Sequence, residues 1–62
     1  MIKLEPITMI NIVQIMSGFI EDWMVSRTFT KNGKEVYVRG FGRTRREALI
    51  DFDAEVYDEE YN

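Results

Sequence analysis

Apolar and polar residues alternate on both sides of Asn32-Gly33, a pattern that is typical of two paired β-strands. Asn and Gly both tolerate the positive φ angles of a type I′ turn, so this dipeptide predicts a two-residue hairpin loop. We therefore expect strands over residues 19–30 and 35–41, joined by this turn.

The turn also determines which side chains share a face of the sheet. One face pairs Trp23 with Gly42, Val25 with Gly40, Arg27 with Val38 and Phe29 with Val36. The opposite face pairs Met24 with Phe41, Ser26 with Arg39, Thr28 with Tyr37 and Thr30 with Glu35. The first face is the more apolar of the two, and we expect it to form the core.

Residues 7–16 are rich in β-branched side chains, which are stiff at χ1 and favour a strand. These side chains are Ile7, Ile10, Ile12, Val13 and Ile15. Pro6 precedes them, and proline suits the first turn of a helix, so a helix is the alternative for this segment.

The register of this first strand follows if Ser17-Gly18 forms a second tight turn. It then pairs Ile12 with Trp23 and Ile10 with Val25, which places both isoleucines on the expected core face. Gln14 opposite Glu21 fits that apolar face poorly, so a bulge near this pair is a further expectation.

The segment Thr44-Arg45-Arg46-Glu47 has the pattern of a helix capping box. The hydroxyl of Thr44 is expected to accept from the amide of Glu47, whose carboxylate accepts in turn from the amide of Thr44. A helix over residues 45–59 follows. Its core-facing stripe consists of Ala48, Leu49, Phe52 and Val56.

These elements predict a single α+β domain over residues 1–62. Its three-stranded antiparallel sheet has the order 1-2-3, and the C-terminal helix of this β-β-β-α chain packs on one face. Gly40 and Gly42 point inward from the third strand, so the helix can approach the sheet closely there. A chain of 62 residues buries only about 60% of its unfolded surface, so we also expect self-association.

Composition excludes several kinds of chemistry. The chain has no Cys and no His, so it forms no disulfide, no Cys/His zinc site and no His general base. Asp51, Glu55 and Asp58 share one helical face, which we interpret as solvated. We expect no enzymatic activity, no cofactor and no metal. The lack of Cys and of a long apolar segment indicates a cytoplasmic protein without a membrane span.

A second apolar stripe lies opposite the core stripe of the helix. It consists of Ile50, Ala54, Tyr57 and Tyr61, spaced at i, i+4, i+7 and i+11. A helix with one buried face is expected to be polar there, and Tyr is enriched at interfaces. We expect this stripe to bind a protein partner or a second copy of the chain. Scattered surface apolar residues are the alternative.

Basic residues gather near the predicted start of the helix. They are Arg39, Arg43, Arg45 and Arg46, and Tyr37 and Phe41 share the outer sheet face with Arg39. Arginines beside helix amides can hold a phosphate or carboxylate, and aromatic rings beside Arg can stack single-stranded bases. We take these six residues as candidate anion or nucleic-acid contacts. The alternative is structural, with Arg43 paired to Glu47 and the others solvated.

The stretch 40–49 resembles the strand-to-helix junction of HicB-like antitoxins, which share a partial double-stranded-RNA-binding-like fold. The junction Gly-x-Thr-x-x-Glu-Ala-hydrophobic is matched by Gly42, Thr44, Glu47, Ala48 and Leu49. Residues 17–19 are similar to the Gly-aromatic turn between that family's first two strands. The tight Asn-Gly turn departs from the family, and no fourth strand or DNA-binding segment follows the helix. The resemblance implies a β-β-β-α topology and a non-catalytic, self-associating inhibitor or adaptor.

Together these patterns predict a small protein-interaction module that acts as a homodimer. Its small size and its net charge of -3 suggest an inhibitor or accessory protein of bacterial or phage type. The alternative is a nucleic-acid-binding protein that uses the arginine cluster with Tyr37 and Phe41.

Overall fold

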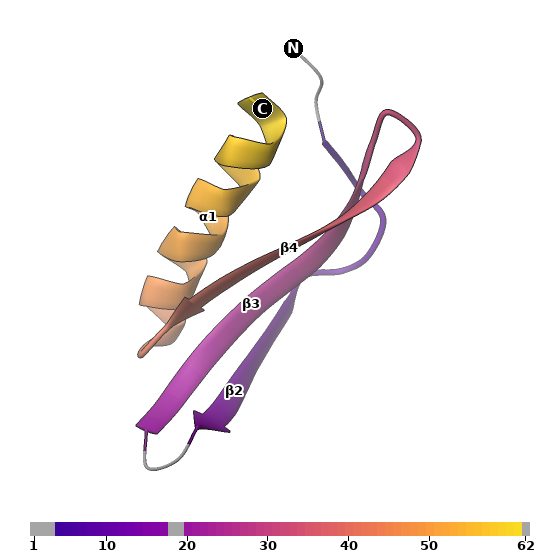
Figure 1. Cartoon of the computed structure of the whole chain (residues 1–62). Coiled ribbons are helices and arrows are strands. Elements are labelled where there is room, and N and C mark those ends of the chain that lie inside the picture. Colours follow the sequence, from indigo (N-terminus) through magenta and orange to yellow (C-terminus); the bar gives the residue numbers. More distant parts are fainter. Residues whose placement is uncertain (1–3, 18–19, 62) are drawn as a thin grey trace.

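The structure is a computed structural model that describes residues 4–17 and 20–61. It is an α+β fold with an antiparallel sheet and one C-terminal helix (Figure 1). The strands are β1 (Glu5–Pro6), β2 (Asn11–Ser17), β3 (Ile20–Lys31) and β4 (Lys34–Gly42), and the helix is α1 (Arg45–Tyr61). Figure 1 shows α1 on one side of the sheet.

The hairpin between β3 and β4 confirms the prediction made from Asn32-Gly33. Both residues have positive φ angles, 54° for Asn32 and 75° for Gly33, as a type I′ turn requires. Every predicted pair between the two strands is present, from Trp23 opposite Gly42 to Thr30 opposite Glu35. The turn chemistry alone therefore set the register of the longest ladder in the sheet.

The first predicted strand, over residues 7–16, is a strand only from residue 11 onward, and none of it is a helix. β2 begins at residue 11, residues 7–10 belong to no strand, and β1 adds a short segment before them. β4 pairs with β3 at both ends, so β1 and β2 must share the other edge of β3. The sheet therefore has four strands instead of the predicted three, although it is three strands wide.

The break is a bulge that hydrogen-bonds to β3. The bulge expected near Gln14 is absent, because residues 11–17 pair with β3 without interruption. Pro6 pairs with Phe29 and Asn11 with Ser26, so residues 7–10 lie opposite residues 27 and 28. Three hydrogen bonds bridge this mismatch. The Thr28 amide donates to Thr8 Oγ1 at 3.1 Å, Arg27 Nε donates to the Thr8 carbonyl at 2.8 Å, and the Ile7 amide donates to the Thr28 carbonyl at 2.9 Å.

The predicted register between β2 and β3 is wrong by two residues. Ile12 pairs with Val25 and Gln14 with Trp23, because the ladder closes with Ser17 opposite Ile20. Gly18, half of the predicted turn, lies outside the described residues. A shift of two preserves the face of each side chain, so Ile12 still packs against the core. Ile10 falls in the bulge and is exposed.

The predicted core face is confirmed. Its buried side chains are Leu4, Val25, Phe29, Val38, Ala48 and Phe52. Packed against them and partly buried are Ile12, Trp23, Val36, Leu49 and Val56. The rings of Phe29 and Phe52 stack across the two layers, with centroids 6.3 Å apart.

The helix lies against β4 where glycines replace side chains. A Cβ at Gly40 would lie 2.5 Å from Phe52 Cα and 2.7 Å from the Ala48 carbonyl, and it would also meet the Phe52 amide nitrogen. A Cβ at Gly42 would lie 2.5 Å from the Ala48 amide nitrogen. The two backbones are therefore in direct contact, as the inward glycines predicted.

The helix begins at Arg45 as predicted and ends at Tyr61, two residues beyond the predicted 59. Half of the capping box is confirmed, since Thr44 Oγ1 accepts from the Glu47 amide at 3.1 Å. The other half is wrong: Glu47 Oε2 accepts from the Arg43 amide at 3.1 Å, one residue earlier than expected. At the other end, Lys31 Nζ donates to the Glu59 carbonyl and lies 3.8 Å from its carboxylate. A positive charge at this position stabilises the helix, because the C-terminal end of the helix dipole is negative.

We predict that Gly40→Ala destabilises the fold by about 3 kcal/mol, because the new Cβ meets backbone atoms that cannot move aside. The total stability of a chain this long is roughly 3–9 kcal/mol, so the substitution should remove between a third and all of the free energy of unfolding. Chemical denaturation followed by circular dichroism measures the loss.

Gly33→Asn is the matched control, since nothing lies within 4 Å of a Cβ at Gly33 and Asn tolerates its positive φ. It should cost about 1 kcal/mol or less. Equal losses for the two variants would contradict the close contact between β4 and α1.

Candidate functional site

Four of the predicted site residues form an exposed stripe along α1, here called the tyrosine stripe: Ile50, Ala54, Tyr57 and Tyr61. The exposed fractions are 61% for Ile50, 60% for Tyr57 and 54% for Tyr61. The rings of Tyr57 and Tyr61 touch, with centroids 4.4 Å apart. The core residues Ala48 and Phe52 occupy the opposite side of the same helix. The stripe is therefore a continuous apolar surface that faces away from the sheet.

The predicted arginine cluster is divided between the two faces of the sheet. Arg39 lies on the outer face, with its guanidinium carbon 5.6 Å from the Tyr37 ring centroid and 6.0 Å from that of Phe41. Arg45 instead lies 5.6 Å over the ring of Trp23, which packs against the core. The structure therefore unites Arg39 with the two predicted aromatic residues and separates it from Arg45.

The two remaining arginines, Arg43 and Arg46, are exposed near the start of α1. The hydrogen bond that joins Arg43 to Glu47 comes from the backbone amide of Arg43. Arg46 directly precedes the tyrosine stripe, four residues before Ile50, and so lies on the same side of the helix.

The outer face of the sheet carries an apolar row that crosses three strands. Val13 pairs with Met24, and Met24 pairs with Phe41. Val13 and Phe41 are both exposed. Sequence reasoning named Met24 and Phe41 but missed Val13, because its neighbour across the sheet follows from the corrected register of β2.

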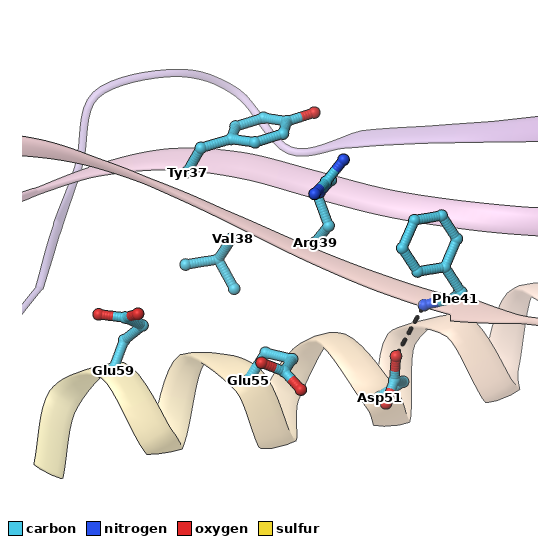
Figure 2. A pocket seen from close by; sticks show the side chains of 7 residues that line it. All are labelled: Tyr37, Val38, Arg39, Phe41, Asp51, Glu55 and Glu59. Carbon is cyan, nitrogen blue, oxygen red and sulfur yellow. Dashed lines mark hydrogen bonds between the residues drawn. The ribbon is translucent and has the colours of Figure 1, made fainter. Parts of the chain in front are cut away.

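A groove of about 310 Å³ lies between β4 and α1, and Figure 2 shows its lining. The residues are Tyr37, Val38, Arg39 and Phe41 of β4 with Asp51, Glu55 and Glu59 of α1. Asp51 Oδ2 accepts a hydrogen bond from the Phe41 amide at 2.8 Å. Asp51, Glu55 and Asp58 are all exposed, as the prediction of a solvated acidic face requires. Asp51 and Glu55 also line the groove, where Glu59 joins them in place of Asp58.

The groove runs along the free edge of β4. β4 pairs with β3 alone among the described strands, so its other edge is open. The Phe41 amide points toward that edge, as its bond to Asp51 shows. Strand amides alternate in direction, so the amides of Tyr37 and Arg39 point the same way. The predicted strand order 1-2-3 already leaves one edge of the third strand unpaired, but no signal in the sequence places the acids of α1 beside that edge.

Two kinds of feature are absent from the part of the chain that the structure describes. Across residues 4–17 and 20–61, no group of three acidic side chains is placed to hold a metal ion. Within the same ranges, no helix has the length and apolarity needed to cross a membrane.

No family model, curated protein or solved structure matches this chain. Three surfaces of the structure are candidates for binding: the tyrosine stripe, the outer sheet face around Arg39, and the groove between β4 and α1.

We predict that Arg45→Ala shifts the fluorescence maximum of Trp23 to longer wavelength, because the guanidinium covers the indole ring. The stacking is worth about 0.5–1 kcal/mol at such a site. Arg46→Ala is the control, since Arg46 is the same residue type one position later, and it should leave the spectrum unchanged. Identical spectra for the two variants would show that Arg45 does not cover Trp23.

Proposed function

We propose that this protein is a small non-catalytic protein-interaction module that forms a homodimer through the tyrosine stripe. The observation that carries the proposal is the stripe itself, which exposes apolar side chains over three turns of α1 while the opposite side packs on the sheet. A helix with one buried side is expected to be polar on the other. An inhibitor or accessory role in the cytoplasm of a bacterium, or for a phage, fits such a module.

The charges at the two ends of α1 complement each other in an antiparallel pair of helices. Arg46 is exposed at the start, while Asp58 and Glu60 lie near the end. Lys31 pairs with Glu59 within the same molecule, which leaves Asp58 and Glu60 for a partner. Two copies packed antiparallel place each basic start beside the other copy's acidic finish. The contact is isologous, as a two-fold dimer requires.

The apolar residues of the stripe fit the same arrangement. Ala54 lies at its middle, between Ile50 and Tyr57, so the smallest side chain falls where two antiparallel helices cross. Its small size allows close approach of the helices, and the larger side chains on either side pack against the partner. Burial of this surface contributes about 25 cal/mol per Å², which supports a chain with a small core.

We predict that the protein is a dimer at high micromolar concentration and low salt, and that Ile50→Glu weakens the dimer at least about tenfold, a loss of ~1.4 kcal/mol. Light scattering after gel filtration measures the mass, and circular dichroism checks that the variant remains folded. Ile7→Glu is the control. Ile7 is also exposed, but it lies in the bulge before β2 and not on α1. A monomeric wild-type chain under these conditions would contradict the proposal.

Nucleic-acid binding is the second candidate, supported by the stacking of Arg39 with Tyr37 and Phe41 on the uncovered sheet face. It ranks second because Arg45 lies on the other face and three carboxylates line the neighbouring groove. A salt titration with a fluorescent single-stranded oligonucleotide tests it, because binding through arginines weakens steeply with salt. No binding at low salt would exclude it.

A further inference from the structure

We propose that the free edge of β4 binds an extended peptide that carries lysine or arginine at alternate positions. The peptide lies in the groove between β4 and α1 and adds one strand to the sheet. This site is separate from the tyrosine stripe, because the groove acids and the stripe occupy different sides of α1. An experiment that contradicts the proposed dimer therefore leaves the proposed peptide site untouched, and the reverse also holds.

The main-chain groups of β4 supply the first part of the argument. An open strand edge is a template for a further strand, which gains affinity from backbone hydrogen bonds. The amides of Tyr37 and Arg39 point to this edge. The next amide that points the same way, that of Phe41, already donates a hydrogen bond to Asp51. The carboxylate of Asp51 thus holds the position that a carbonyl of an added strand would take. The part of the edge that is free to pair with a peptide therefore extends from Arg39 toward the Asn32-Gly33 hairpin and stops before Phe41.

The charges of the opposite wall supply the second part. Asp51, Glu55 and Glu59 line the groove from α1 (Figure 2). Glu59 has Lys31 as a cationic partner, which shows that the end of this row accepts a lysine ammonium. Neither Asp51 nor Glu55 has an ion-pair partner among the described residues. A cation from another molecule would complement these two carboxylates.

The spacing of the carboxylates selects an extended peptide with alternating charge. Helix residues four apart are separated by about 6 Å along the axis. Alternate side chains of an extended strand are separated by about 6.8 Å and point to the same face. Basic residues at positions i and i+2 of a peptide therefore match neighbouring acids of α1 in both interval and direction.

Arg39 disfavours basic residues at the intervening positions. The side chains between the basic ones point to the other face of the sheet, where Arg39 lies between Tyr37 and Phe41. A basic side chain at an intervening position would be repelled by the guanidinium of Arg39, whereas an apolar side chain would pack beside the rings of Tyr37 and Phe41. The preferred pattern therefore alternates basic and apolar residues, and a simple run of lysines is disfavoured.

The test uses the full chain with two fluorescent heptapeptides of the same composition. One has the alternating sequence Thr-Lys-Val-Lys-Val-Lys-Thr, and the other has its lysines in one block, Thr-Lys-Lys-Lys-Val-Val-Thr. Fluorescence anisotropy should show tighter binding of the alternating peptide. Amide chemical shifts should move most at Tyr37 and Arg39, and hydrogen exchange of these two amides should slow.

Glu55→Gln should weaken binding of the alternating peptide about threefold to fivefold, as loss of an exposed ion pair does. Asp53→Asn is the matched control: it also removes one negative charge from an exposed position of α1, but away from the groove, and it should leave the affinity unchanged.

Three results would overturn the inference. Equal affinity for the two peptides would show non-specific attraction of charges. Shifts confined to the tyrosine stripe or to the outer face around Val13 would place the peptide elsewhere. The amides of Tyr37 and Arg39 could also exchange slowly in the absence of peptide. If this protection became stronger as the protein concentration rises, a second copy of the chain would occupy the edge.

Discussion

The contact between the backbones of β4 and α1 at Gly40 and Gly42 is the constraint on which the rest of this structure depends. A small chain has few side chains with which to build two layers. At Gly40 and Gly42 the sheet and the helix are in contact with no side chain from β4 between them. The contact holds the helix along β4, where Ala48 and Phe52 are buried. Phe29 and Val38 then complete the core beneath it.

The position of α1 also decides which surfaces stay open. Because the helix lies close to β4, Asp51 reaches the Phe41 amide and the acidic side of α1 borders the free strand edge. The tyrosine stripe lies on the far side of the helix, and the outer face of the sheet is left uncovered. The proposed dimer and the proposed peptide site are therefore both consequences of one packing contact, although they use different groups.

Features governed by neighbouring residues were predictable from the sequence. The Asn32-Gly33 turn, the core face that it sets and the helix start at Arg45 each depend on a few adjacent side chains. The glycines were informative because an inward position without a side chain has an immediate steric meaning. The alternation of side chains even preserved the face of Ile12 when its register was wrong by two residues.

Features governed by distant residues were not predictable. The break before β2 depends on Thr8 meeting Thr28 and Arg27, which lie about twenty residues away in the chain. Likewise, Lys31 reaches the end of α1 and Arg45 reaches Trp23 across the fold. The groove was missed for the same reason, since the acids of α1 acquire a role only when the free edge of β4 is placed beside them.

The most direct test of the central contact is nuclear Overhauser spectroscopy on the isotopically labelled protein. Direct contact of the two backbones predicts strong cross-peaks between the α-protons of Gly40 and the amide proton of Phe52, and between those of Gly42 and the amide proton of Ala48. Side chains separate most helix and sheet backbones, so such peaks are a specific signature of glycine packing. Their absence from a folded protein would contradict this account, because α1 would then lie elsewhere on the sheet.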